Sequence, residues 1–205
     1  LSSFIMQASE SIISICFNSS LQSYGGDIAV GAMTILTSVM QFAMLPLQGL
    51  GQGAQPIISY NYGARNPERV KAAFKLLLKS SLVYSTLLWA LVMLFPQAFA
   101  AMFTSSETLM TFTQKALRIY MACLLLFGIQ IACQMTFTSL GNAKASILVA
   151  VMRKFILLIP LIYIMPLLFS ADKTTAVYMA EPVADFIAVT FTAIFFTFQF
   201  KKALK

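Results

Sequence analysis

The residues that could do chemistry are a carboxylate and several amides and hydroxyls set in otherwise apolar sequence. Glu10 shares one helical face with Gln7, Ser14 and Asn18 when the first apolar run is drawn as a helix. A carboxylate in such surroundings typically marks an ion or proton pathway. We therefore expect Glu10 to bind a cation or a proton, with the three neighbouring polar side chains lining a cavity beside it. The alternative is a carboxyl near the cytoplasmic end that snorkels or forms a hydrogen bond with a neighbouring helix.

Two further apolar runs carry polar side chains with helical spacing. Thr37, Gln41 and Gln48 fall close to one angular position of the second run, and Gln130 and Gln134 are four residues apart on a later one. Amides offer hydrogen-bond donors and acceptors without a fixed charge. These residues are therefore predicted to line the same polar cavity.

The stretch GLGQGAQPIISYNYGARN, residues 49–66, is a flexible and polar break between apolar runs. Pro46 and Pro56 remove backbone hydrogen bonds and permit a kink. Gly49 and Gly53 form a GxxxG pattern, which lets a neighbouring helix approach closely. The four residues are predicted to act in bending, in helix packing, or in both.

A pair of acidic residues lies near the start of the last apolar run. Glu181 and Asp185 are four residues apart and share a helical face. One interpretation is that they complement the positive end of the helix dipole, with Pro182 in the first turn. The other is that they form an outer vestibule that attracts cations.

The elements that position these residues follow from composition and run length. Of 205 residues, 59% are hydrophobic and 10% are charged, against about 25% charged in soluble domains. Runs of this length match the roughly 20 residues that cross a bilayer, and they are too continuous for barrel strands. We predict an all-α integral membrane protein, a six-transmembrane-helix bundle, with spans near 2–24, 28–60, 80–100, 116–140, 147–169 and 177–200.

Basic residues are distributed unequally between the two sides of this bundle. Counting the connections alternately, eleven fall on one side: Arg65, Arg69, Lys71, Lys75, Lys79, Lys144, Arg153, Lys154, Lys201, Lys202 and Lys205. The other side receives Lys115, Arg118 and Lys173. The positive-inside rule then predicts a multi-pass protein of the inner (plasma) membrane with both ends of the chain cytoplasmic. The asymmetry also explains the net charge of +7, so no nucleic-acid partner is expected.

No pattern typical of an enzyme is present. The sequence has no histidine and no GxSxG, Walker A or HExxH motif, and its three cysteines all lie in apolar runs. We expect no enzymatic activity and no metal site. Leu1 begins inside an apolar run, and we expect the chain to be a piece of a longer protein.

Three segments carry a resemblance to a known family. GLGQGAQPIISYNYGARNPERVK (49–71) resembles the signature that joins two helices in the C-terminal half of multidrug and toxic compound extrusion (MATE) transporters. SLGNAKASILVAVMRKFILLIPLIYIMP (139–166) and AEPVADF (180–186) resemble two later segments of the family. The resemblance runs in order along essentially the whole chain.

The resemblance implies that residues 1–205 are the C-terminal lobe of a twelve-helix, two-lobe antiporter. Its partners would be membrane lipids, the N-terminal lobe and a small amphipathic or cationic substrate, exported by alternating access in exchange for Na⁺ or H⁺. Glu10 is similar in place to a glutamate proposed as the coupling cation or proton site. Some Na⁺-coupled members carry an acidic residue on the helix corresponding to 116–140, where this chain has none. The coupling ion therefore stays open, and no other cofactor is expected.

Two other functions fit the same sequence. A lipid-linked glycan flippase of related architecture would favour a large, basic cavity. A membrane assembly subunit without transport activity would satisfy its polar stripes within the bundle and leave no cavity. A wide groove lined by Glu10, Gln41, Gln48 and Gln130 would argue against the second alternative.

Overall fold

The computed structural model describes the backbone of residues 2–204 and the side chains of residues 9–204. The helices are α1 (Ser2–Gly63), α2 (Pro67–Leu94), α3 (Pro96–Ala101), α4 (Glu107–Tyr120), the 3₁₀ turn η1 (Leu124–Leu126), α5 (Phe127–Ser139), α6 (Ala143–Val151), the π-helix η2 (Met152–Leu158), α7 (Ile159–Leu168) and α8 (Lys173–Ala203). No β-strand occurs in residues 2–204. The predicted all-α class is confirmed.

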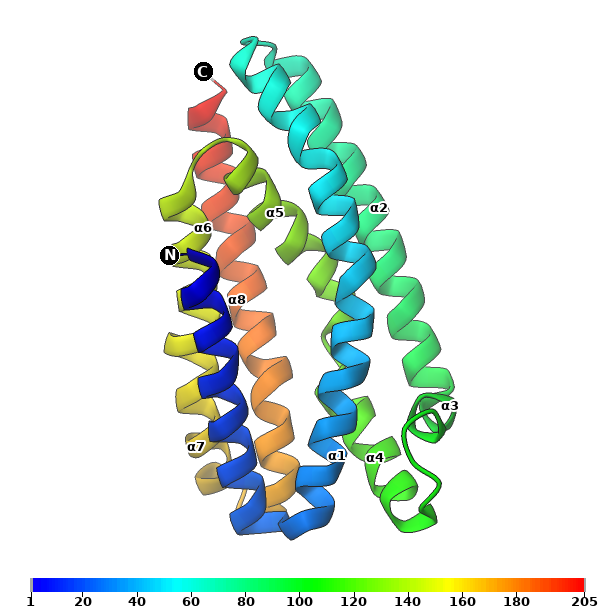
Figure 1. The fold of residues 1–205 in the computed structure, drawn as a ribbon. Coiled ribbons are helices and arrows are strands. Elements are labelled where there is room, and N and C mark those ends of the chain that lie inside the picture. The colour runs from blue at the N-terminus through cyan, green and yellow to red at the C-terminus, as the bar shows by residue number, and fades with distance from the viewer. Residues whose placement is uncertain (1, 205) are drawn as a thin grey trace.

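Helix α1 is a helical hairpin rather than one rod. Its 62 residues would span roughly 90 Å if straight, about three times the hydrocarbon core of a bilayer. Gly26 interrupts the helical dihedrals with φ 62° and ψ −158°, and the chain turns back there (Figure 1). We call residues 2–25 the first arm and residues 27–63 the second arm. The break predicted at residues 24–27 is confirmed.

The chain makes six passes: the two arms, α2, the bent pair of α4 with α5, the continuous run of α6 to α7, and α8. Four helical stretches are long and apolar enough to cross a membrane: Ser9–Gly63, Pro67–Leu94, Ala143–Leu168 and Lys173–Ala203. The turn at Gly26 divides the first of them into the two arms. The axes of α4 and of the segment Leu124–Ser139 differ by 44°, so the fourth pass is a broken helix. The predicted six-helix bundle is therefore confirmed, with the third span starting at Pro67 rather than near residue 80.

Three helix starts are fixed by side-chain caps. Asn66 Oδ1 accepts a hydrogen bond from the backbone N–H of Arg69 at 3.2 Å, and Pro67 occupies the first turn. Asn142 caps α6, and Asp172 caps α8, in the same way. Each cap satisfies a helix-end donor that has no partner inside its helix. The caps explain why α2 and α8 begin earlier than their apolar runs.

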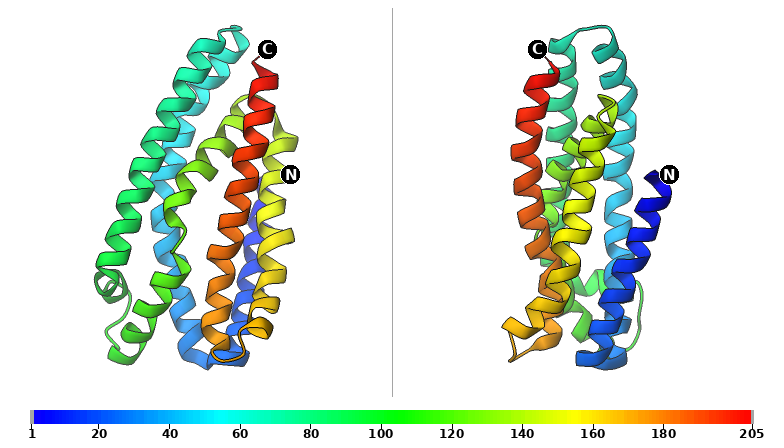
Figure 2. Two further views of the ribbon diagram at one scale, coloured as in Figure 1. Left: turned by 180° about the vertical axis from the view of Figure 1, so that it is seen from behind. Right: turned by 90° about the vertical axis from the view of Figure 1, so that its left-hand side faces the viewer.

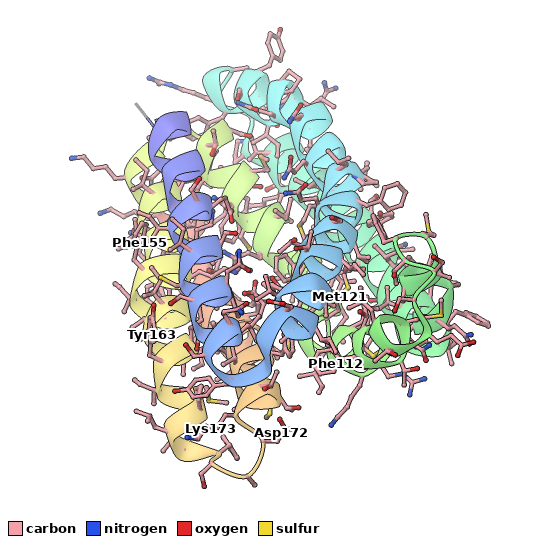
Figure 3. All side chains as sticks on the ribbon, turned by 60° about the horizontal axis from the view of Figure 1, so that its bottom comes forward. Phe112, Met121, Phe155, Tyr163, Asp172 and Lys173 are labelled. Carbon is pink, nitrogen blue, oxygen red and sulfur yellow. The ribbon has the colours of Figure 1, made fainter. Side chains whose placement is uncertain are left out.

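The connections gather at two opposite ends of the bundle. The α1–α2 turn and the C-terminal end of α8 lie at one end, and the Gly26 turn, α3 and the α7–α8 turn lie at the other (Figures 1 and 2). Figure 3 shows Asp172 and Lys173 at this second end, beside the turn of α1. The exposed basic residues of the first end include Arg65, Arg69, Lys71, Lys144, Lys201 and Lys202.

The predicted charge asymmetry holds for those exposed residues but not for Arg153 and Lys154. Both lie inside a span, and Lys154 is buried there. Assigning them to a surface connection was wrong, since their side chains are paired within the bundle.

We predict that Gly26→Ala destabilises the protein by about 1–3 kcal/mol, because its backbone region is essentially restricted to glycine. A Cβ at Gly26 would meet no atom within 4 Å, so the cost is backbone strain alone. Gly49→Ala is the matched control, because its Cβ also meets open space and its backbone is helical. Thermal unfolding of the full-length protein in detergent measures both variants, and equal melting temperatures would contradict the assignment.

Candidate functional site

Five charged side chains from three elements meet inside the bundle, and we call them the ionic cluster: Glu10, Arg153, Lys154, Glu181 and Asp185. Arg153 Nη2 donates to Glu181 Oε1 at 2.8 Å, and Arg153 Nε donates to Asp185 Oδ1 at 2.6 Å. Lys154 Nζ donates to the carboxylate of Glu10. The cluster joins the first arm, η2 and α8.

The cluster lies near the middle of the membrane-spanning region. Glu181 and Asp185 are eight and twelve residues after the start of α8, which places them about 12 and 18 Å along it. Their side chains are 6% and 2% exposed. The prediction of an outer vestibule is therefore wrong, and so is the alternative that places them in a first helical turn. Their shared helical face was predicted correctly, because both accept hydrogen bonds from Arg153.

The wide turn of η2 presents the two basic residues to different partners. Ile159 N–H bonds to the carbonyl of Lys154, five residues back, instead of to the residue four back. Pro160 follows immediately, has no N–H, and its ring crowds the carbonyl four residues earlier. Single π-type turns of this kind occur frequently at functional sites. Arg153 thereby reaches α8 while Lys154 reaches the first arm.

A cavity of about 70 Å³ adjoins the cluster. Its lining includes Glu10, Ser14 and Thr37, three of the residues predicted to form the site. Glu181 on α8, Tyr120 on α4 and the basic side chains of η2 complete the polar part of the lining. Thr37 Oγ1 donates to the carbonyl of Met33 at 3.0 Å, so its hydroxyl oxygen can still accept. The cavity is small, polar on one side and bounded by fixed charges.

Glu10 differs from the rest of the cluster in exposure. Its side chain is 60% exposed, whereas that of its partner Lys154 is 10% exposed. The carboxylate therefore lies at the boundary between the ionic cluster and the open face of the first arm. An ion arriving from that face meets Glu10 before it meets any other acidic member of the cluster.

The remaining predicted cavity residues do not line this cavity. Gln41 and Gln48 are exposed on the second arm, and Asn18 and Gln134 are half-buried. The structure does not bring them to Glu10, and the side chain of Gln7 lies outside the described residues.

Gln130 is also separate from the site. Its side chain is buried, and its Oε1 accepts no hydrogen bond from the residues that the structure describes. The wide groove expected from Glu10, Gln41, Gln48 and Gln130 is therefore not formed within this lobe.

Arg153, Lys154 and Tyr120 are the members of the site that the sequence did not single out. The signal for the two basic residues was present, since MRKF lies inside the predicted span 147–169. A charge inside a span requires a counter-charge, and Glu10, Glu181 and Asp185 were the acids available inside other spans. Tyr120 carries no such signal, because a tyrosine near a helix end has many ordinary roles.

A larger groove of about 840 Å³ runs between the second arm and α2. Pro46, Gly49 and Gly53 line it, and Pro56 is exposed nearby. The two glycines meet no neighbouring atoms, so the predicted close helix packing at the GxxxG pattern is wrong within this lobe. Gly51 packs instead, against Met135 of α5.

The bend at the two prolines stays a prediction. The second arm passes through both prolines as one helix, and Gly26 is where α1 leaves helical dihedrals.

Among the described side chains, no group of three or more His, Cys, Asp or Glu could hold a metal ion.

Comparisons with known proteins agree on one family. A model of the MatE family matches residues 2–164. The multidrug export protein MepA of Staphylococcus haemolyticus (strain JCSC1435) is 24% identical over 187 residues, which are 91% of this chain and 41% of that protein.

Solved structures show the same fold. A crystal structure of MATE in the straight conformation superposes with a TM-score of 0.90 at 20% identity, covering 97% of this chain and 44% of that one. A structure of the MATE multidrug transporter DinF-BH gives a TM-score of 0.80 at 33% identity, with 94% and 43% covered. This chain thus spans less than half the length of these relatives.

We predict that Arg153→Met destabilises the protein by about 3–5 kcal/mol, because it leaves two buried carboxylates without their ion-pair partner. Lys79→Met is the control, since Lys79 is exposed on α2 and such surface changes usually stay within about 0.5 kcal/mol. Thermal unfolding in detergent checks the pair. Equal stability of the two variants would show that Arg153 does not hold the cluster together.

Proposed function

This chain belongs to the MatE family, and from that premise we propose that it is the C-terminal lobe of a multidrug efflux antiporter. The whole protein would export small amphipathic or cationic compounds in exchange for Na⁺ or H⁺ by alternating access. Its partners would be an N-terminal lobe, membrane lipids and the exported compound. Because the activity moves ions and substrates without a chemical step, we propose that the chain is not an enzyme.

The observation that carries this proposal is the pairing of Glu10 with Lys154 beside a cavity. Glu10 is largely exposed and its partner is a cation that belongs to the protein. An incoming cation can replace that partner without leaving the carboxylate unpaired. If one conformation favours the internal pair and the other favours the incoming cation, binding shifts the equilibrium between them.

The polar side chains of the second arm support an aqueous passage outside this lobe. Gln41 and Gln48 are exposed, and an amide facing hydrocarbon would leave its donors and acceptors unpaired. We propose that they face the passage between the two lobes. This arrangement disfavours the assembly subunit, whose polar stripes would be satisfied inside its own bundle.

The composition of the cavity bears on the flippase alternative. Its charged lining consists of two acids, Glu10 and Glu181, and two bases, Arg153 and Lys154. A cavity for a lipid-linked glycan carrying phosphate would hold an excess of basic residues. The balance therefore favours exchange of cations.

We propose that the end of the bundle that carries Arg65, Lys144 and Lys201 faces the cytoplasm of a plasma membrane. Their exposure at one end satisfies the positive-inside rule, which fixes the orientation of the other end as well. The cluster would then lie between the two aqueous compartments.

We predict that Glu10→Gln in the full-length protein lowers ion-driven export of a fluorescent rhodamine cation by about tenfold or more, because a charge-assisted contact contributes about 1.5–3 kcal/mol. Expression and membrane insertion should be unchanged. Export is measured in vesicles under an imposed Na⁺ or H⁺ gradient. Glu107→Gln, an exposed acid outside the cluster, is the matched control.

A double variant distinguishes two causes of lost export: loss of the Glu10 carboxylate, and a Lys154 left without its ion-pair partner. Glu10→Gln with Lys154→Gln removes both charges of the pair. If Glu10 is the coupling site, the double variant stays inactive. Recovery of export in the double variant, or normal export in the single one, would overturn the assignment.

A further inference from the structure

The ionic cluster is not electrically balanced. It contains three carboxylates, those of Glu10, Glu181 and Asp185, and two basic side chains, Arg153 and Lys154. With every group in its usual ionised form, the cluster carries one excess negative charge. A buried charge without a partner is costly in any low-dielectric interior.

The geometry locates the excess charge. Lys154 neutralises Glu10 on the exposed side, which leaves Arg153 to serve both acids of α8. Asp185 accepts from Arg153 Nε, and Glu181 Oε1 accepts from Nη2. Glu181 Oε2 is buried and forms no hydrogen bond with any described residue. Glu181 also lines the cavity beside Glu10.

We propose that Glu181 is a proton-binding site, with an exchangeable proton held on Oε2 and delivered through the adjoining cavity. Protonation brings the cluster to zero net charge while Oε1 continues to accept the hydrogen bond from Arg153. The protonated Oε2 becomes a donor, and the cavity that Glu181 lines has room for a water molecule. No charge is left uncompensated.

The groups that face Glu181 come from every element packed around it. They are Glu10 of the first arm, Tyr120 at the end of α4, Arg153 and Lys154 of η2, and Asp185 of α8 itself. Cys123, between α4 and η1, lies near Asp185. Both basic residues are already engaged with a carboxylate. Glu181 is better suited to bind a proton than a metal ion, because one free carboxylate oxygen does not form a coordination shell.

A role for this proton in transport rests on the proposed function, whereas the protonation itself does not. Release of the proton would return one negative charge to the cavity wall at the moment a cationic compound approaches Glu10. Uptake of the proton would remove that charge and weaken the attraction. The two acids would thus have different roles. Glu10 would bind the cation, and the protonation state of Glu181 would set the charge of the adjoining cavity wall.

The test is infrared difference spectroscopy of the purified full-length protein between acidic and alkaline pH. We expect a carbonyl band of a buried protonated carboxyl that shifts in D₂O and is lost in Glu181→Gln. Glu107→Gln should retain the band. The Gln variant preserves the acceptor for Arg153 and resembles the neutral acid in shape, so it should fold.

Isotope labelling makes the assignment independent of any variant. Glutamate labelled with ¹³C at its side-chain carboxyl should shift the band in the unmodified protein, and labelled aspartate should leave it in place. A band that persists in Glu181→Gln, or one that shifts with labelled aspartate, overturns the proposal. So does the absence of such a band in the unmodified protein.

The outcome is distinguishable from that of the proposed function. Ion-driven export by the unmodified protein, together with a band that survives Glu181→Gln, overturns the proton site alone. Loss of the band in that variant, together with no ion-driven export by the unmodified protein, leaves the proton site standing and overturns the transport function.

Discussion

The arrangement of this helical bundle depends on the cost of placing charge inside a membrane. An ionised side chain at the centre of a span costs at least about 2.5–3.5 kcal/mol on insertion scales. Five unpaired charges would cost on the order of 10 kcal/mol or more, which is comparable to the whole stability of a typical domain. The first arm, η2 and α8 must therefore lie side by side, because each carries charges that only the others can neutralise. Apolar packing alone would not specify this, since lipid chains solvate apolar helix faces equally well.

The same constraint gives a reason for the π-helix in the fifth pass. Arg153 and Lys154 are adjacent in sequence, yet one must reach α8 and the other the first arm. The wide turn ending before Pro160 alters the local backbone where the two side chains diverge. Arg153 also lies over the ring of Phe127, 4.8 Å from its centre, which fixes the guanidinium from the side of α5. A lysine at this position could not bridge two carboxylates with a rigid fork.

Much of the fold follows from the sequence, because bilayer thickness converts run length directly into passes. The turn at Gly26 and the number of spans were predictable in this way, whereas the start of the third span at Pro67 was not. The pairing of the passes was not, since helical periodicity shows which face of a helix is polar but not which neighbour it meets. The two α8 acids were placed too near the surface because the Asp172 cap starts that helix ahead of its apolar run. The amides of the second arm were assigned to one cavity from angular agreement alone, which fixes direction around a helix but not distance along it.

Exposure divides the ionic cluster into a part that can exchange partners and a part that cannot. Glu10 is accessible on the open face of the first arm, whereas Asp185 and Arg153 are enclosed by the bundle. An enclosed pair is costly to break, so its geometry is fixed. An exposed carboxylate paired with a buried lysine can change partners at much lower cost, since water and incoming cations reach one side of it. The bundle therefore combines a buried, fixed group of charges with one replaceable contact, and the replaceable contact lies on the exposed face of the first arm.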